Sequence, residues 1–187
     1  MNTSLSSTAS RPTSFTTQAC SSDQRFSQLP RSAIWRRANV PLWNNTDLGG
    51  LRVAITAHDL AAGVPPHLRA DLAAARSRAD VLVATFHVTG PPSYLPRPEL
   101  IAAADLALAA GATVVAAHGT HMLARVERRG RAIIAWGLGN LAFACACTDE
   151  ESGALLEVTL TPAGAGAASI IPSTPASETH LPARPPT

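Results

Sequence analysis

The chain has 187 residues, of which 46% are hydrophobic and only 4% aromatic. This length suits one domain, and the apolar fraction is sufficient for a folded core. All 15 basic residues are arginine, and with 13 acidic residues the net charge is only +2. No apolar run approaches the length of a membrane-spanning helix. The composition therefore predicts a single globular domain with no transmembrane segment, and it argues against nucleic acid as a partner.

The two ends of the chain differ from its middle in composition. Residues 1–30 are rich in Ser and Thr and lack the continuous apolar segment of a signal peptide, so we expect a disordered leader there and the cytoplasm as the default location. Residues 31–50 form a transitional segment, 51–172 the folded domain, and 173–187 a disordered tail rich in proline.

The middle of the chain alternates short apolar runs with stretches rich in Ala and Leu. The apolar runs predict strands at 51–56, 81–86 and 113–117, and the stretches between them predict helices at 67–78 and 98–110. Strands at 123–127 and 131–136 flank Arg128-Arg129-Gly130 and predict a hairpin. Two further strands are expected at 155–160 and 169–171. The order predicts an α/β fold with a mixed sheet, a β-α-β unit and a C-terminal hairpin.

Three histidines follow predicted strands. His87 comes after the run 81–86, and His118 comes after 113–117. Strands joined by a crossover helix run parallel, so both histidines should lie at one edge of the sheet. The short Gly119-Thr120 turn would bring His121 back beside His118. Because neutral imidazole suits zinc and related ions, the pattern predicts a metal site made of His87, His118 and His121.

The other polar residues that could serve a site are interpreted as supporting or structural residues. Asn140 stands at a glycine-rich strand break, where it either orients a histidine or contacts substrate, or serves the turn itself. His58, His67 and His180 are interpreted as surface or capped polar residues. The pair Cys145 and Cys147 lacks a second pair, so small apolar residues in a strand are favoured over metal ligands.

Five short motifs occur in an order typical of one protein family. Residues 85–90 are the counterpart of a Ser-Leu-His-Trp-Gly motif, 110–112 of an Ala-Gly-Ala helix end and 117–123 of a Gly-His-x-Pro-His-Val-Leu motif. Residues 129–133 are the counterpart of a Lys-Gly-Arg-Pro-Ile hairpin and 137–141 of a Ser-Leu-Gly-Asn-Phe motif. In these motifs the chain resembles the C-terminal half of the CapA family, poly-γ-glutamate capsule synthesis proteins related to calcineurin-like metallophosphoesterases.

The resemblance implies a partial metallophosphoesterase-like sandwich, a divalent metal of unspecified identity and hydrolase-type chemistry. It assigns residues 51–172 to a CapA-like C-terminal half-domain, and it implies a protein of a kind that is often exported or membrane-associated. The family's N-terminal Gly-Asp and Asn-Asn-His motifs have no counterpart, because Asn44-Asn45 lacks the following histidine and Asp59 follows the wrong strand. Without a bridging carboxylate, the sequence predicts an incomplete two-metal site.

Three hypotheses therefore stay open. The chain is a truncated hydrolase-type domain of capsule or poly-γ-glutamate biosynthesis, or a non-catalytic remnant that serves as a binding scaffold. In the third, it is one half of a split enzyme, and a separate chain supplies the complementary N-terminal half-domain as its partner.

Overall fold

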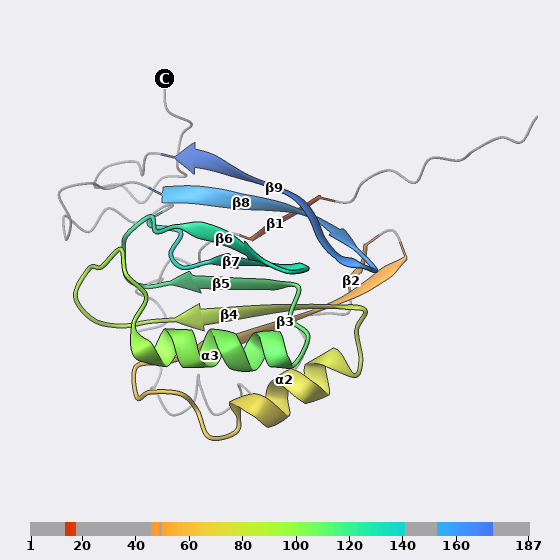
Figure 1. The fold of residues 1–187 in the computed structure, drawn as a ribbon, viewed down its shortest axis with the longest axis horizontal. Coiled ribbons are helices and arrows are strands. Elements are labelled where there is room, and N and C mark those ends of the chain that lie inside the picture. The colour runs from red at the N-terminus through yellow and green to blue at the C-terminus, as the bar shows by residue number, and fades with distance from the viewer. Residues whose placement is uncertain (1–13, 18–45, 49, 141–152, 174–187) are drawn as a thin grey trace, which may run out of the picture.

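The structure is a computed structural model that describes residues 14–17, 46–48, 50–140 and 153–173 (Figure 1). In these ranges the chain forms nine strands and two helices. They are β1 (Ser14–Thr17), β2 (Thr46–Leu48), β3 (Leu51–Asp59), α2 (Leu68–Arg76), β4 (Val81–His87), α3 (Pro98–Ala109), β5 (Val114–His118), β6 (Val126–Arg129), β7 (Ala132–Ala135), β8 (Gly153–Thr161) and β9 (Gly164–Ser173).

A six-stranded mixed sheet lies at the centre of the fold, with strand order β2-β3-β4-β5-β7-β6. The four inner strands run parallel, and β2 and β6 pair antiparallel at the two edges. Helix α2 connects β3 to β4, and α3 connects β4 to β5. The predicted mixed sheet and β-α-β unit are confirmed, with a second unit of the same kind beside the first.

Both helices pack on one face of this sheet (Figure 1). Helix α2 buries Leu68, Leu72 and Ala75, a spacing of four and three residues that puts them on one side of the helix. Helix α3 begins at Pro98 and buries mainly alanines. Small side chains let a helix approach the sheet closely, which explains how a chain poor in aromatic residues fills its core.

The other face of the sheet is covered by a three-stranded sheet of order β1-β8-β9. Leu156, Val158 and Leu160 of β8 pack against valines of the central sheet, including Val83 and Val114. The molecule therefore has three layers, helices, central sheet and second sheet, as Figure 1 shows. This arrangement confirms the expected α/β sandwich. The predicted hairpin at 123–127 and 131–136 is β6 and β7, and β8 and β9 form a further antiparallel pair.

The predictions for the N-terminal leader and for the last strand need correction. Residues 14–17 lie within the expected disordered leader but form β1, which pairs antiparallel with β8, because an edge of that sheet offers them backbone partners. The last strand is predicted at 169–171 but runs from Gly164 to Ser173, since it pairs with β8 along nearly its whole length. The other residues of the leader, Cys145, Cys147, Asn44-Asn45 and His180 lie outside the described residues.

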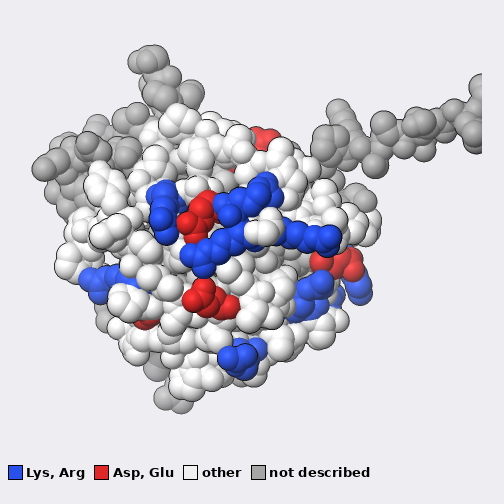
Figure 2. All heavy atoms as spheres, viewed as in Figure 1, with Lys and Arg blue, Asp and Glu red and all other residues white. Residues whose placement is uncertain are grey.

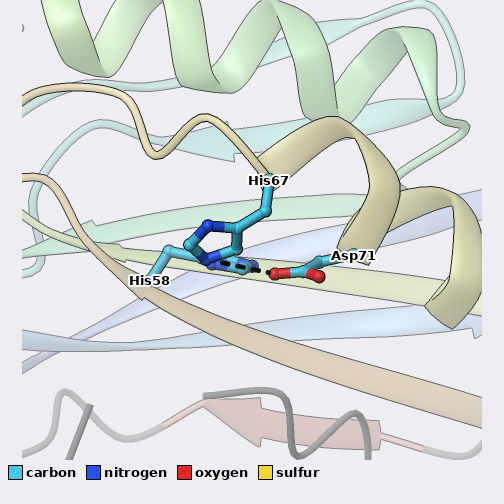
Figure 3. A group of neighbouring side chains, drawn as sticks. All are labelled: His58, His67 and Asp71. Carbon is cyan, nitrogen blue, oxygen red and sulfur yellow. Dashed lines mark ion pairs between the residues drawn. The ribbon is translucent and has the colours of Figure 1, made fainter. Parts of the chain in front are cut away.

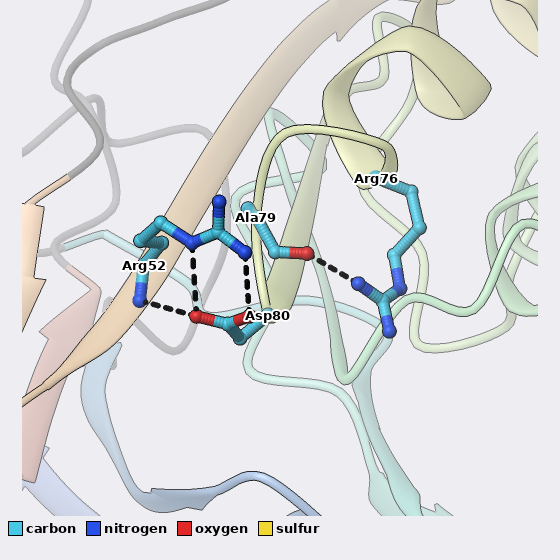
Figure 4. Close-up of polar contacts among 4 residues, drawn as sticks. All are labelled: Arg52, Arg76, Ala79 and Asp80. Carbon is cyan, nitrogen blue, oxygen red and sulfur yellow. Dashed lines mark hydrogen bonds and ion pairs between the residues drawn. The ribbon is translucent and has the colours of Figure 1, made fainter.

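An ion pair links the start of β3 to the residue before β4 (Figure 4). The Arg52 guanidinium donates to both carboxylate oxygens of Asp80, at 3.2 and 2.9 Å, and the Arg52 backbone N–H donates to the same carboxylate at 3.0 Å. These bonds lower the pKa of Asp80 to about 2. In the turn just before, Arg76 donates to the carbonyl of Ala79. The side chains thus tie the end of α2 and the start of β4 to β3.

Arginine and acidic side chains are interleaved on the face shown in Figure 2. On the hairpin of β6 and β7, Arg129 lies 2.8 Å from Glu127 and 3.1 Å from Asp105 of α3, and Arg125 lies 3.2 Å from Glu127. Arg128 donates to the carbonyl of Ala165 at 2.7 Å. The local cluster of arginines is therefore partly neutralised by its own neighbours. Of the helices in the described ranges, none is long and apolar enough to cross a membrane.

Candidate metal centre

Asp59, His87 and His118 end three adjacent parallel strands and stand in one row. Strand pairing places Asp59 opposite His87, and His87 opposite His118. Side chains alternate between the two faces of a sheet, and these three share parity with the valines that pack against β8. The row therefore lies at the carboxyl edge of the sheet, on the face opposite the helices.

The three side chains are close enough to interact. Asp59 Oδ1 lies 3.4 Å from His87 Nδ1. The rings of His87 and His118 are 5.3 Å apart between centroids and tilted by 42°. Backbone bonds continue the ladder past the row, from Leu60 N–H to His87 O and from Val88 N–H to His118 O, both 2.8 Å. The sheet itself thus holds a carboxylate and two imidazoles side by side.

His118 is held in its neutral form. Burial, with a smaller contribution from the nearby His87, lowers the pKa of its imidazole to about 4, and Asp59 opposes the shift. Desolvation penalises the charged form of a histidine, so the neutral ring keeps a nitrogen lone pair at neutral pH. A neutral imidazole is the form that binds a metal ion.

Gly119 makes room for the His87 ring. A β-carbon at position 119 would lie 2.6 Å from His87 Cδ2, 2.7 Å from His87 Nε2 and 2.6 Å from the Val88 carbonyl oxygen. The residue also has φ +96°, a conformation that favours glycine. The two nitrogens of His87 therefore have different neighbours: Nδ1 faces Asp59, and Nε2 lies against the backbone of the loop that follows β5.

His121 and Asn140 form a separate pair beyond this row. His121 Nδ1 lies 2.7 Å from Asn140 Oδ1. With that oxygen as acceptor, the proton is on Nδ1 and the lone pair on Nε2. His121 has φ +58°, which is uncommon outside glycine and asparagine. Asn140 is only 4% exposed, so it is set firmly enough to orient the histidine.

The structure brings the predicted ligands together only in part. It pairs His87 with His118 and His121 with Asn140, but the ligand atoms of His87, His118 and His121 do not all lie within 4.8 Å of one another. It also adds Asp59, which the sequence interpretation sets aside. The predicted first strand ends at 56, whereas the observed strand continues to Asp59, which is therefore paired with His87 of β4.

Among the described residues, a different group of three side chains brings its ligand atoms together. His58, His67 and Asp71 each offer one ligand atom, all within 4.8 Å of one another, and could hold a metal ion (Figure 3). The interpretation of His58 as a surface or capped residue is wrong, because it is 4% exposed beneath α2. Sequence reasoning missed the group because its members come from two elements. The i, i+4 spacing of His67 and Asp71 was the available signal.

Comparison with known proteins supplies the family. Residues 11–144 match the family described as bacterial capsule synthesis protein PGA_cap. A solved structure of a hypothetical protein from Thermus thermophilus is similar at 14% identity and TM-score 0.48; the match covers 66% of this chain and 58% of that one. The chain thus spans little more than half the length of that structure. No curated protein matches the chain. Because the family match covers well over half of the 187 residues, the chain belongs to the bacterial capsule synthesis protein family PGA_cap.

Proposed function

We propose that this chain carries a metal-dependent, hydrolase-type site that acts in bacterial capsule synthesis, with poly-γ-glutamate as the polymer. The observation that supports it is the row of Asp59, His87 and His118 at the carboxyl edge of three parallel strands. That edge is where open α/β sheets bind ligands. His121 follows in the next loop, with Asn140 at its Nδ1.

The donor chemistry fits a divalent ion. His87, His118 and His121 would supply imidazole nitrogens, the ligand type of catalytic zinc sites. Their ligand atoms do not all lie within 4.8 Å of one another, so binding one ion would require the side chains to move together. A bound ion of this kind would polarise a phosphoester oxygen and lower the pKa of a bound water. Neutral His118 needs no deprotonation before it binds.

Asp59 has an orienting role in this proposal. Its carboxylate oxygen lies 3.4 Å from His87 Nδ1, so a His87 ring protonated there would donate to Asp59 and keep its lone pair on Nε2. Nε2 lies against Gly119, in the segment that links His118 to His121. In the same way, a His121 ring protonated at Nδ1 would donate to Asn140 Oδ1 and keep its lone pair on Nε2. The chain's own residues thus hold protons away from the side where an ion would bind.

The test measures metal content and hydrolysis of a generic phosphoester by the full chain. The double variant His87→Ala, His118→Ala should lose one equivalent of bound zinc, whereas Asp105→Asn, an exposed acid of α3, should keep it. Equal zinc content in the wild type and the double variant would remove the site. Circular dichroism of each variant checks that the fold is retained.

Hydrolysis separates the other hypotheses. Zinc bound at this site without turnover would favour a binding scaffold. Turnover that appears only when a complementary N-terminal half-domain is added would favour one half of a split enzyme. Turnover by the isolated chain, lost in the double variant, would establish a complete hydrolase.

A further inference from the structure

His58, His67 and Asp71 form a cluster on the helix side of the central sheet, away from the row of Asp59, His87 and His118. His58 precedes Asp59 in β3, so alternation turns the two side chains to opposite faces. Beneath α2, His58 packs beside Phe86, with ring centroids 6.1 Å apart. His67 immediately precedes α2, and Asp71 lies in its first turn. Figure 3 shows the three side chains pointing toward one another from these two elements.

Two buried polar atoms in this cluster have no hydrogen bond within the described part of the chain. They are His58 Nε2 and Asp71 Oδ2. An unsatisfied buried polar atom is costly, about 1–3 kcal/mol, and rare in folded proteins. Asp71 Oδ2 has an ion-pair contact with His67 Nε2, but at 3.6 Å it is too long for a hydrogen bond. The two atoms could both donate an electron pair to a bound ion, and no such partner is present among the described residues.

We propose that His58, His67 and Asp71 bind a zinc-class divalent ion that fastens the start of α2 to β3. Two imidazoles and one carboxylate are a known ligand set for zinc, which leaves a fourth position for water. The three ligand atoms already lie within 4.8 Å of one another, so only small side-chain movements are needed to enclose an ion.

The environment of each ligand fits this role. His58 is only 4% exposed, and its Nε2 has no hydrogen bond within the described part of the chain, so the ring offers a buried nitrogen that lacks a partner. The side chain of His67 is 56% exposed and that of Asp71 is 21% exposed. An ion can therefore reach the cluster from solvent, while His58 forms its buried wall. A bound water is the competing occupant, because it too could bond to both buried atoms.

The site would be structural. His58 comes from β3, His67 from the residue just before α2 and Asp71 from the first turn of α2, and the loop 60–66 separates the strand from the other two in sequence. An ion that binds only the folded arrangement stabilises the fold, by an amount that grows with the logarithm of the free ion concentration relative to its Kd. Metal should therefore raise the melting temperature whether or not the chain hydrolyses anything.

The experiment uses the full chain, made metal-free and carrying His87→Ala and His118→Ala, so that the proposed hydrolase site is absent. Titration with Co²⁺ should give one equivalent of binding with the visible absorption of a tetrahedral ion. Zn²⁺ should raise the melting temperature by several degrees. If the hydrolase proposal fails, this result is unaffected, because the two sites share no ligand.

Adding His67→Ala should abolish both the cobalt absorption and the zinc-dependent rise in melting temperature. His67 is largely exposed, so its removal should leave the fold intact. Asp71→Asn is the second variant, since it keeps the shape and removes the charge. Arg69→Ala, exposed in the same turn of α2, is the matched control and should behave like its parent.

Two outcomes would overturn the proposal. One is a folded parent protein that binds neither ion and shows no change in melting temperature, which would leave water as the occupant. The other is undiminished binding after His67→Ala or Asp71→Asn, which would place the ion elsewhere. If the parent double variant does not fold, the same comparison is made in the wild type, where His67→Ala should remove one equivalent of zinc.

Discussion

Asp59 and His87 face each other across β3 and β4, with the carboxylate oxygen Oδ1 3.4 Å from the imidazole Nδ1. They are paired residues at the ends of adjacent parallel strands, so their proximity is built into the sheet register. A carboxylate beside the distal nitrogen of a ligand histidine fixes its tautomer and raises its basicity. The relationship places a carboxylate beside one of the histidines proposed as metal ligands.

Replacing Asp59 with asparagine should weaken zinc binding at the proposed hydrolase site by about 10- to 100-fold, as expected for the loss of an orienting carboxylate. The fold should be unchanged, because Asp59 is partly exposed at a strand end. Isothermal titration of the His67→Ala background isolates this site from the other one. Unaltered affinity would assign Asp59 no part in it, and Asp105→Asn serves as the charge control.

Gly119→Ala should damage the same site through sterics. The added β-carbon would come within 2.6 Å of the His87 ring and of the Val88 carbonyl, and φ +96° is strained for alanine. We expect a loss of about 1–3 kcal/mol in unfolding free energy together with weaker zinc binding. Urea unfolding and zinc titration measure the two effects. Gly63→Ala, also at positive φ but with open space around the new β-carbon, is the matched control for backbone strain alone. Equal losses in the two variants would contradict a specific role for Gly119.

The stability of the metal-free protein should fall as the pH drops from about 6.5 to about 4. Above this range His118 is neutral in both states; within it the unfolded chain binds a proton that the folded chain, with a pKa of about 4, does not. Below about pH 4 the contribution levels off, at a loss of about 3 kcal/mol. His58 adds to the loss in the same direction, because its pKa is lowered too.

His118→Gln should reduce this pH dependence, since glutamine does not titrate. Urea unfolding at several pH values between 7 and 4 gives the slope for each protein. A slope as steep in the variant as in the wild type would show that other groups carry the effect.

Asp80→Asn should destabilise the fold slightly, and more at low salt than at high salt, because it weakens an exposed ion pair with Arg52. The pKa of Asp80 is lowered to about 2, so the wild type keeps this contribution above about pH 4 and loses it as the pH falls toward 2. Melting temperatures of both proteins at pH 7 and pH 2 give the comparison. A difference that persists at pH 2 would mean that the charge is not its cause.

The sequence by itself determined the layout of the central domain. Apolar runs and helical stretches alternate with enough regularity to predict β3, α2, β4, α3 and β5, and the crossover rule then places His87 and His118 on one edge. These features are local, because each depends on the periodicity of a few neighbouring residues. The resemblance to the capsule synthesis family was likewise visible in the sequence, and the family match confirms it.

Only the tertiary structure decided the neighbours of Asp59 and His58. Ala57 and His58 give no strand signal of their own, so the extension of β3 to Asp59 depends on its pairing with β4. That extension sets Asp59 beside His87 on one face and His58 beneath α2 on the other. His58 and Asp59 are adjacent in sequence but belong to different candidate sites, because side chains alternate between the two faces of a strand. Their partners are then determined by the pairing between strands and by the packing between layers, which are not local features of the sequence.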